Sequence, residues 1–340
     1  MSHYTLRCTR CGATRRPTPD LLACPACDAP LDAVLHGPAP MPPGGVPLPG
    51  IFRGWDSLPL HDVAAVVSLG EGDTPLVPLA RVGEALGLRH LYAKLEGSNP
   101  TGSFKDRGAA VLLSVLRELG VAALVEDSSG NAGAALAAYA ARGGLRAVVF
   151  APESAPAAKT AQIAVYGAEL RLVPGPRDAA AEAARRYARE HGAVYASHNL
   201  SPSFAHGKKS FVFVAVEQLR GRPIDHIVLP VGNGSLLLGC LLAYQELRAR
   251  GQVEALPRLH AVQSEAVRPL VAAFAGQEWG PEAQAPTVAG GIAVARPPRG
   301  AQAVEAVRAS GGRAVPDPGP AIVRCQRLHP AQDGVVAGPT

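Results

Sequence analysis

From about residue 91 onward, short apolar runs alternate with longer segments whose apolar residues follow helical spacing. The apolar runs lie at 91–95, 122–125, 147–150, 169–173 and 227–231, and the helical segments lie at 109–119, 134–142, 157–166, 178–191 and 236–250. Alternating strands and helices predict an α/β fold in which helices cover parallel sheets. Ligands of such folds bind at the carboxyl ends of the strands.

One lysine stands where such a fold places reactive groups. Residues 99–108 read N-P-T-G-S-F-K-D-R-G, so turn formers precede Lys105 and a helical segment follows it. The positive end of a helix dipole lowers the pKa of a lysine, as burial does. A neutral amine attacks carbonyl carbon to form a Schiff base. Taken alone, this segment fits a solvated first-turn lysine equally well.

Two glycine turns follow strand-like runs and precede helix-like ones. Residues 127–133 read D-S-S-G-N-A-G, and residues 232–235 read G-N-G-S. Unpaired backbone N–H groups at a helix start bind anions, and glycine allows a ligand to approach closely. Ser128, Ser129 and Asn131 add side-chain donors to the first turn, whereas the second turn suits a phosphate. Each turn taken singly also fits a purely structural role.

Several segments together resemble the pyridoxal-phosphate enzymes of fold type II, the tryptophan synthase β-subunit superfamily, and within it threonine synthase most closely. They are residues 69–76, 94–108, 128–133, 166–168 and 230–235. The resemblance covers most of the chain after about residue 65. It implies an α/β fold of two open parallel or mixed-sheet subdomains covered by helices, with pyridoxal 5'-phosphate as the cofactor.

The resemblance also implies roles for individual residues. Lys105 would form the internal aldimine and then act as the base at the substrate α-carbon. Asn131 would hydrogen-bond the phenolic oxygen of the cofactor, and Ser128, Ser129 and Asn131 would hold the substrate carboxylate. The cofactor phosphate would rest on the turn formed by Gly232, Asn233, Gly234 and Ser235.

The sequence departs from the family pattern at three places. Residues 206–210 read H-G-K-K-S where related enzymes resemble E-G-Q-K-[ST], so Lys209 and Ser210 match and would bind a substrate phosphate. The two adjacent lysines also fit an exposed charged turn. Ser235 stands where the family more often has glycine. Thr340 fits, by position, the hydroxyl that meets the pyridine nitrogen, and the family usually continues beyond this point, so we expect a shortened C-terminal part.

The activity implied is conversion of O-phospho-L-homoserine and water to L-threonine and phosphate. A serine or threonine dehydratase, or another β-eliminating or β-replacing amino-acid lyase, would share Lys105 and both glycine turns. A non-catalytic regulatory protein that retains the cofactor site also remains open.

Four cysteines form two C-x-x-C pairs within the first 27 residues: Cys8, Cys11, Cys24 and Cys27. Two such pairs complete a tetrahedral zinc shell, and this spacing favours a structural zinc ribbon over disulfides. Ribbons of this kind also precede the catalytic domain of some threonine synthases. We therefore expect a ribbon at 1–35, a Pro- and Gly-rich linker at 36–65 and a catalytic domain at 66–340, with the smaller subdomain at roughly 101–200 and the remainder forming the larger one.

Composition and charge limit the classes of partner that the chain is expected to bind. The chain of 340 residues is 47% hydrophobic with a formal net charge of +5, which fits a filled core. Its basic residues occur as scattered pairs without interleaved aromatics, so a nucleic-acid surface is not expected. No apolar run reaches the ~20 residues that cross a bilayer, and no secretory segment is evident. We expect a cytoplasmic enzyme of small substrates, and the resemblance implies a homodimer.

Overall fold

The computed structural model describes residues 3–39 and 48–340, so part of the expected linker lies outside the described residues. The chain forms two compact units. The first comprises residues 1–73 and 98–210, and the second comprises residues 74–97 and 211–340.

The N-terminal part of the first unit is a small antiparallel sheet in the order β2-β1-β3. Its strands are β1 (Tyr4–Cys8), β2 (Thr14–Arg15) and β3 (Leu31–Leu35). Tyr4, Leu6 and Leu31 are buried on one face and form a small core together with Cys8 and Cys24. This sheet is the ribbon, and its apolar core is too small to stabilise it alone.

Part of the expected linker is helical. Two 3₁₀ helices follow the ribbon, η1 (Gly50–Ser57) and η2 (Val63–Ala65). Ile51, Phe52 and Trp55 of η1 are buried in the core of the first unit.

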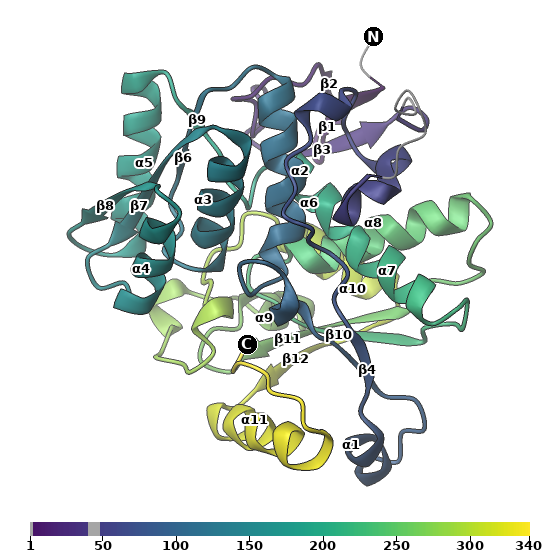
Figure 1. Cartoon of the computed structure of the whole chain (residues 1–340). Helices are drawn as coiled ribbons and strands as arrows, with labels where there is room; N and C mark the ends of the chain where they lie inside the picture. The colour runs from purple at the N-terminus through teal and green to yellow at the C-terminus, as the bar shows by residue number, and fades with distance from the viewer. Residues whose placement is uncertain (1–2, 40–47) are drawn as a thin grey trace. The chain divides into compact units, whose positions relative to one another are not determined.

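A four-stranded parallel sheet in the order β8-β7-β6-β9 organises the rest of the first unit (Figure 1). Its strands are β6 (Ala123–Glu126), β7 (Arg146–Pro152), β8 (Glu169–Val173) and β9 (Val194–Tyr195). Val148 and Phe150 pack on α5, whereas Val149 between them packs on α3 and α4. Because side chains alternate along a strand, helices cover both faces of this sheet, as the hydrophobic pattern predicts.

The helices of the first unit are α2 (Lys105–Glu118), α3 (Asn131–Gly143), α4 (Ala157–Val165), α5 (Arg177–His191) and α6 (Pro202–Lys208). α2 and α6 approach each other closely through two glycines. A Cβ atom on Gly207 would lie 2.0 Å from the backbone oxygen of Arg107, and one on Gly108 would lie 2.7 Å from the Phe204 ring. This contact holds the start of α2 beside the end of α6.

The ribbon packs against the same two helices. His206 of α6 makes a 3.0 Å hydrogen bond from Nε2 to the backbone oxygen of Ala33 in β3. An apolar pocket between the ribbon and α2 is lined by Leu6 and Leu21 on one side and by Leu112 and Leu116 on the other. The ribbon is therefore part of the first unit rather than an appendage on a tether.

The second unit holds a parallel sheet in the order β10-β11-β12 and an antiparallel pair, β4 with β5. The strands are β4 (Leu76–Pro78), β5 (Tyr92–Lys94), β10 (His226–Pro230), β11 (Arg258–Ser264) and β12 (Ala314–Asp317). The α-helices are α1 (Ala80–Ala85), α7 (Ser210–Gln218), α8 (Ser235–Ala249), α9 (Pro269–Phe274), α10 (Gly300–Ala309) and α11 (Gly319–Asp333). Three short 3₁₀ turns complete the set: η3 (Glu96–Ser98), η4 (Pro281–Ala283) and η5 (Gly290–Ile292).

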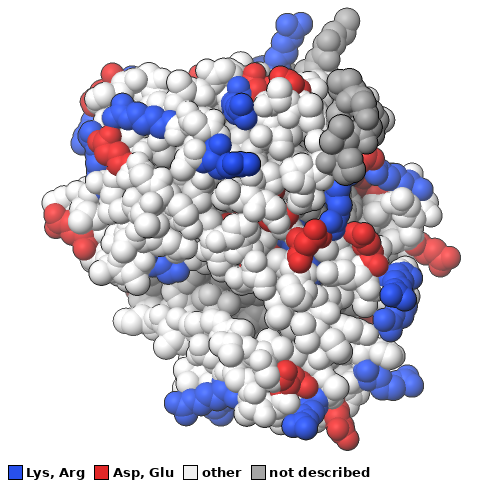
Figure 2. All heavy atoms as spheres, viewed as in Figure 1, with Lys and Arg blue, Asp and Glu red and all other residues white. Residues whose placement is uncertain are grey.

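Helix hydropathy and the distribution of surface charge relate to possible membrane and nucleic-acid partners. Among residues 3–39 and 48–340, no helix has the length and hydropathy to cross a membrane. On the face that Figure 2 shows, Lys and Arg side chains lie scattered among Asp and Glu side chains, without a continuous basic stripe.

Candidate active site and metal centre

Lys105 is the first residue of α2, as the sequence predicts. The lysine is half-buried, and its Nζ lies 4.9 Å from the centre of the Phe104 ring and 6.0 Å from that of Phe204. Burial lowers the pKa of Lys105 to about 8, and the charge of Arg177 lowers it further while Glu126 acts in the opposite direction. At pH 7 about a tenth of this amine is therefore neutral, far more than for a lysine of ordinary pKa, and the neutral form is the one that a nucleophile requires.

The backbone before Lys105 is fixed by its neighbours on α2. The Asp106 carboxylate accepts a 2.7 Å hydrogen bond from the backbone N–H of Thr101 and a second bond from the Thr101 hydroxyl. Arg107 is fully buried and donates to the backbone oxygen of Gly72 at 2.8 Å. These bonds explain why charged residues follow Lys105 directly in the sequence.

The turn from β6 into α3 carries Ser128, Ser129 and Asn131. Gly133 is required here because a Cβ atom would lie 1.9 Å from the backbone oxygen of Ser128. The Oδ1 atom of Asn131 accepts a 2.7 Å hydrogen bond from Nζ of Lys159 in α4. That bond orients the amide and leaves its NH₂ group to donate elsewhere. Sequence reasoning missed Lys159, because only the packing of α4 on α3 brings it to Asn131.

The segment at the end of α6 is buried rather than an exposed turn. Nζ of Lys209 donates to the backbone oxygen of Ser57, and the Ser210 hydroxyl donates to Gly207 O at 2.7 Å and accepts from Arg107 at 3.0 Å. Nζ of Lys208 donates to the backbone oxygen of Phe104 and lies 4.4 Å from the centre of the Phe204 ring. Lys208, which departs from the family pattern, therefore approaches the same two aromatic rings as Lys105.

The second glycine turn lies in the second unit, where β10 leads to α8. Gly234 adopts a φ of +82°, and a Cβ atom there would lie 2.9 Å from Cβ of Ala303; one on Gly232 would lie 3.1 Å from Cα of Ile292. α8 then starts at Ser235 and is 15 residues long, so its first backbone N–H groups have no partner within the helix. The Oδ1 atom of Asn233 is buried and has no hydrogen-bond partner in the described part of the chain.

Thr340 lies close to η5 within the second unit. Its hydroxyl oxygen would be 3.1 Å from a Cβ atom on Gly291, next to the Ile292 that borders Gly232. The C-terminal residue and the Gly232–Ser235 turn thus contact neighbouring residues of one 3₁₀ turn.

Each unit, taken by itself, carries features that fit a part of pyridoxal 5'-phosphate. In the first unit the Lys105 amine suits an aldehyde. In the second unit the narrow glycine turn at the start of a long helix suits a phosphate, and the buried, unpartnered Oδ1 position of Asn233 supplies a polar group, since the NH₂ and oxygen of the amide are interchangeable by rotation.

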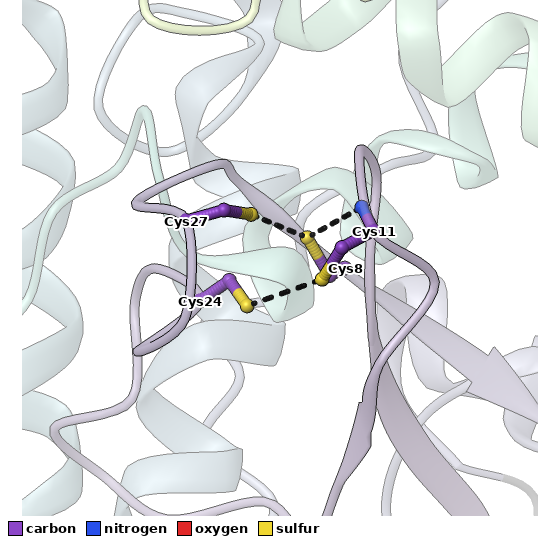
Figure 3. Close-up of side chains that lie close together, drawn as sticks. All are labelled: Cys8, Cys11, Cys24 and Cys27. Atoms are coloured by element: carbon purple, nitrogen blue, oxygen red, sulfur yellow. Dashed lines mark hydrogen bonds between the residues drawn. The ribbon is translucent and has the colours of Figure 1, made fainter.

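The four cysteines of the ribbon point toward one another (Figure 3). Sγ of Cys8 lies 3.4 Å from Sγ of Cys27, and Sγ of Cys11 lies 3.7 Å from Sγ of Cys24; all four sulfurs lie within 4.8 Å of one another. A tetrahedron with Zn–S bonds of ~2.3 Å has sulfurs about 3.8 Å apart. A hydrogen bond from the Cys11 backbone N–H lowers the pKa of the Cys8 thiol to about 6. The geometry is compatible with a structural zinc ion.

A second group of ligand-type side chains, absent from the sequence predictions, lies at the carboxyl end of β6 and in the segment after β9. Glu126, Asp127 and His198 are all buried, and their ligand atoms lie within 4.8 Å of one another. The signal for Glu126 and Asp127 is present in the sequence, because two carboxylates at the end of a buried strand are unusual. His198 gives no such signal, since only the β6–β9 pairing brings it near them.

The fold and the lysine site define a class of enzyme, and comparison with known proteins shows the same class. Residues 67–340 match the family described as "Pyridoxal-phosphate dependent enzyme". The chain belongs to this family.

The curated relatives narrow the family further. The chain is 34% identical to the threonine synthase of Methanocaldococcus jannaschii over 85% of its own length and 72% of that protein. It is 35% identical to the threonine synthase of Bacillus sp. (strain ULM1), over 85% of its own length and 80% of that protein. It is thus a threonine synthase-like, pyridoxal-phosphate dependent enzyme.

Solved structures share the fold. A maize serine racemase superposes with a TM-score of 0.69 at 24% identity, covering 78% of each chain. A threonine deaminase from T.th. superposes with a TM-score of 0.68 at 26% identity, covering 78% of this chain and 83% of that one. These likenesses confirm the predicted fold type II architecture.

Proposed function

We propose that the protein is a threonine synthase that converts O-phospho-L-homoserine and water to L-threonine and phosphate, with Lys105 holding the cofactor aldehyde. The observation that carries the proposal is the half-buried Lys105 amine at the start of α2, with a pKa of about 8, in a chain whose curated relatives are named threonine synthases. When bound, pyridoxal 5'-phosphate supplies an electron sink for the carbanion at the substrate α-carbon.

In this proposal, the residues of the chain bind, orient and move protons. Lys105 takes and returns the proton at the substrate α-carbon. Ser128, Ser129 and Asn131 bind the substrate carboxylate at the start of α3, with the Asn131 amide oriented by Lys159. Gly232, Asn233, Gly234 and Ser235 bind the cofactor phosphate, and the Thr340 hydroxyl meets the pyridine nitrogen.

We propose Lys209 and Ser210 as the ligands of the substrate phosphate. Both side chains are buried, so a phosphate that reaches them would interact with little screening by solvent. Lys208 adds a second buried cation in the same segment. The Cys8, Cys11, Cys24 and Cys27 cluster binds zinc, and the enzyme acts as a homodimer in the cytoplasm.

The second candidate is a serine or threonine dehydratase, or another lyase that eliminates or replaces a group at the β-carbon. The similarity to the T.th. threonine deaminase favours this alternative. It needs Lys105 and both glycine turns but no second phosphate pocket.

Incubation with each substrate separates the candidates. A threonine synthase releases inorganic phosphate and threonine in equal amounts from O-phospho-L-homoserine. A dehydratase instead releases ammonia and a 2-oxo acid from serine or threonine, and that outcome would contradict the first proposal. Borohydride reduction followed by peptide mapping should place the cofactor on Lys105, and Lys105→Ala should abolish both the adduct and the turnover.

A further inference from the structure

A buried pair of ionisable side chains lies in the first unit, at the carboxyl end of β6 and in the segment after β9. Glu126 is the last residue of β6 and is fully buried; its Oε1 lies 2.6 Å from Nδ1 of His198, which is also buried. Its other oxygen, Oε2, is buried and has no hydrogen-bond partner among the described residues. His198 thus fixes one carboxylate oxygen and leaves the second without a local partner.

The neighbouring carboxylate has a different arrangement. Asp127 follows Glu126 directly, and the Tyr195 side chain in β9 lowers the pKa of the Asp127 carboxyl, against burial, which raises it. Asp127 therefore has a local partner of its own. The charge of Glu126 raises the pKa of Lys105, whereas Asp127 is not among the groups that shift this pKa.

Cations surround this pair. The ammonium groups of Lys105 and Lys208 lie over the same two rings, those of Phe104 and Phe204, and the His198 ring packs edge-on against Phe204 with centroids 5.9 Å apart. Charged groups on several elements shift the pKa values of Glu126, His198 and Lys105. They come from α2, α5, α6, the end of β6 and the segment after β9. These groups are Lys105, Arg177, Lys208, Glu126, Asp127 and His198. The cations Arg177 and Lys208, joined by Lys105 in its protonated form, favour ion pairing with these carboxylates over capture of a metal ion at this cluster.

The proposed role of Lys105 requires an amine that loses its proton readily. In a buried site the charge of a carboxylate acts strongly on a nearby ammonium, because little water screens it. We propose that Glu126, oriented by His198, is the counter-charge of Lys105 and controls how much of that lysine is present as free amine. The inference rests on the proposed function, because that function is what requires the free amine of Lys105. The protonation state of this amine can nevertheless be measured without any assay of activity.

The direction of the effect follows from electrostatics. An ionised Glu126 stabilises the ammonium form of Lys105, and a neutral Glu126 releases the amine. Burial raises the pKa of Glu126 to about 8, against the charges of Arg177 and Lys105, which lower it. The carboxyl and the amine therefore titrate in the same pH range, so each responds to the state of the other.

Trace acetylation measures the free amine directly. The full chain is treated with hydroxylamine to remove any bound aldehyde, labelled with acetic anhydride across a series from about pH 6 to 10, and the Lys105 peptide is quantified by mass spectrometry. In Glu126→Gln we expect the midpoint of Lys105 labelling to fall by about one pH unit, and labelling below the midpoint to rise about tenfold. An unchanged or higher midpoint would overturn the proposal.

Matched variants separate this role from a general disturbance of the fold. Asp127→Asn removes the adjacent carboxylate and should move the midpoint less than half as far as Glu126→Gln. His198→Phe removes the donor at Nδ1 and should act in the same direction as Glu126→Gln, while His198→Asn keeps a donor near that position and should restore the original midpoint. Equal shifts in all of these variants would show a structural effect and refute the assignment.

The same samples distinguish the two proposals. If the labelling midpoint shifts as expected but borohydride fails to fix the cofactor to Lys105, the proposed function fails and the role of Glu126 stands. If the cofactor is fixed to Lys105 and the midpoint does not move, the role of Glu126 fails alone.

Discussion

Lys105 and Glu126 show how burial changes the chemistry of single residues. The ordinary pKa values of the two groups are 10.5 and 4.5, and burial moves both to about 8. An acid whose pKa is raised by folding stabilises the folded state below its ordinary pKa, and that contribution is lost as the pH rises through the folded value. A base whose pKa is lowered contributes above its ordinary value and loses that contribution as the pH falls.

The first prediction at this scale concerns stability and pH. Between about pH 4.5 and 8 the free energy of unfolding of the wild type should fall relative to that of Glu126→Gln, by on the order of 5 kcal/mol. Burial lowers the pKa of His198, and the titration of this histidine acts in the opposite direction in each protein. Urea unfolding across this pH range measures the difference.

An exposed carboxylate supplies the control. Glu153→Gln should track the wild type throughout that range, because the side chain is exposed. A constant difference between the wild type and Glu126→Gln would contradict the raised pKa.

At the scale of helices, the contact between α2 and α6 positions Lys105. In Gly207→Ala the new Cβ atom would lie 2.0 Å from the backbone oxygen of Arg107, so the two helices must separate. We expect a loss of roughly 1–3 kcal/mol of stability, as overpacked cores show. Fluorescence of Trp55, in a Trp279→Phe background, follows unfolding of the first unit because these are the two tryptophans of the chain.

Gly130→Ala is the matched control within the first unit, because the nearest atom to a Cβ atom there is Oγ of Ser128, at 3.9 Å. Equal stabilities of the two alanine variants would show that α2 and α6 adjust without cost.

The elements themselves were largely predictable from sequence. The predicted apolar runs at 147–150 and 169–173 became β7 and β8, and the segment at 178–191 became α5. β9 escaped prediction because its pairing with β6 spans only two residues, Val194 and Tyr195, and has no periodicity of its own. The glycine turns were predictable because close backbone approach requires glycine, whereas Lys159 and His198 reach the site only through tertiary packing.

At the scale of the molecule, the ribbon and the lysine site belong to one compact unit. His206 joins β3 to α6, and α6 packs on α2, so loss of the proposed zinc ion should destabilise more of the first unit than the ribbon. In Cys8→Ser combined with Cys11→Ser, we expect zinc to be lost and the first unit to be destabilised by on the order of 3 kcal/mol. Metal analysis and Trp55 fluorescence measure the two effects.

Cys325→Ser changes an exposed thiol of the second unit and should alter neither quantity. If the ribbon double variant keeps the stability of the wild type, the ribbon does not stabilise the unit on which it packs.

The apolar pocket between the ribbon and α2 has a practical consequence for shortened versions of this enzyme. Leu112 and Leu116 have Leu6 and Leu21 opposite them in that pocket. A preparation trimmed to the region that aligns with the enzyme family would expose those leucines to water. Such a fragment would self-associate through the uncovered strip, so its poor behaviour in solution would say nothing about the competence of the catalytic residues.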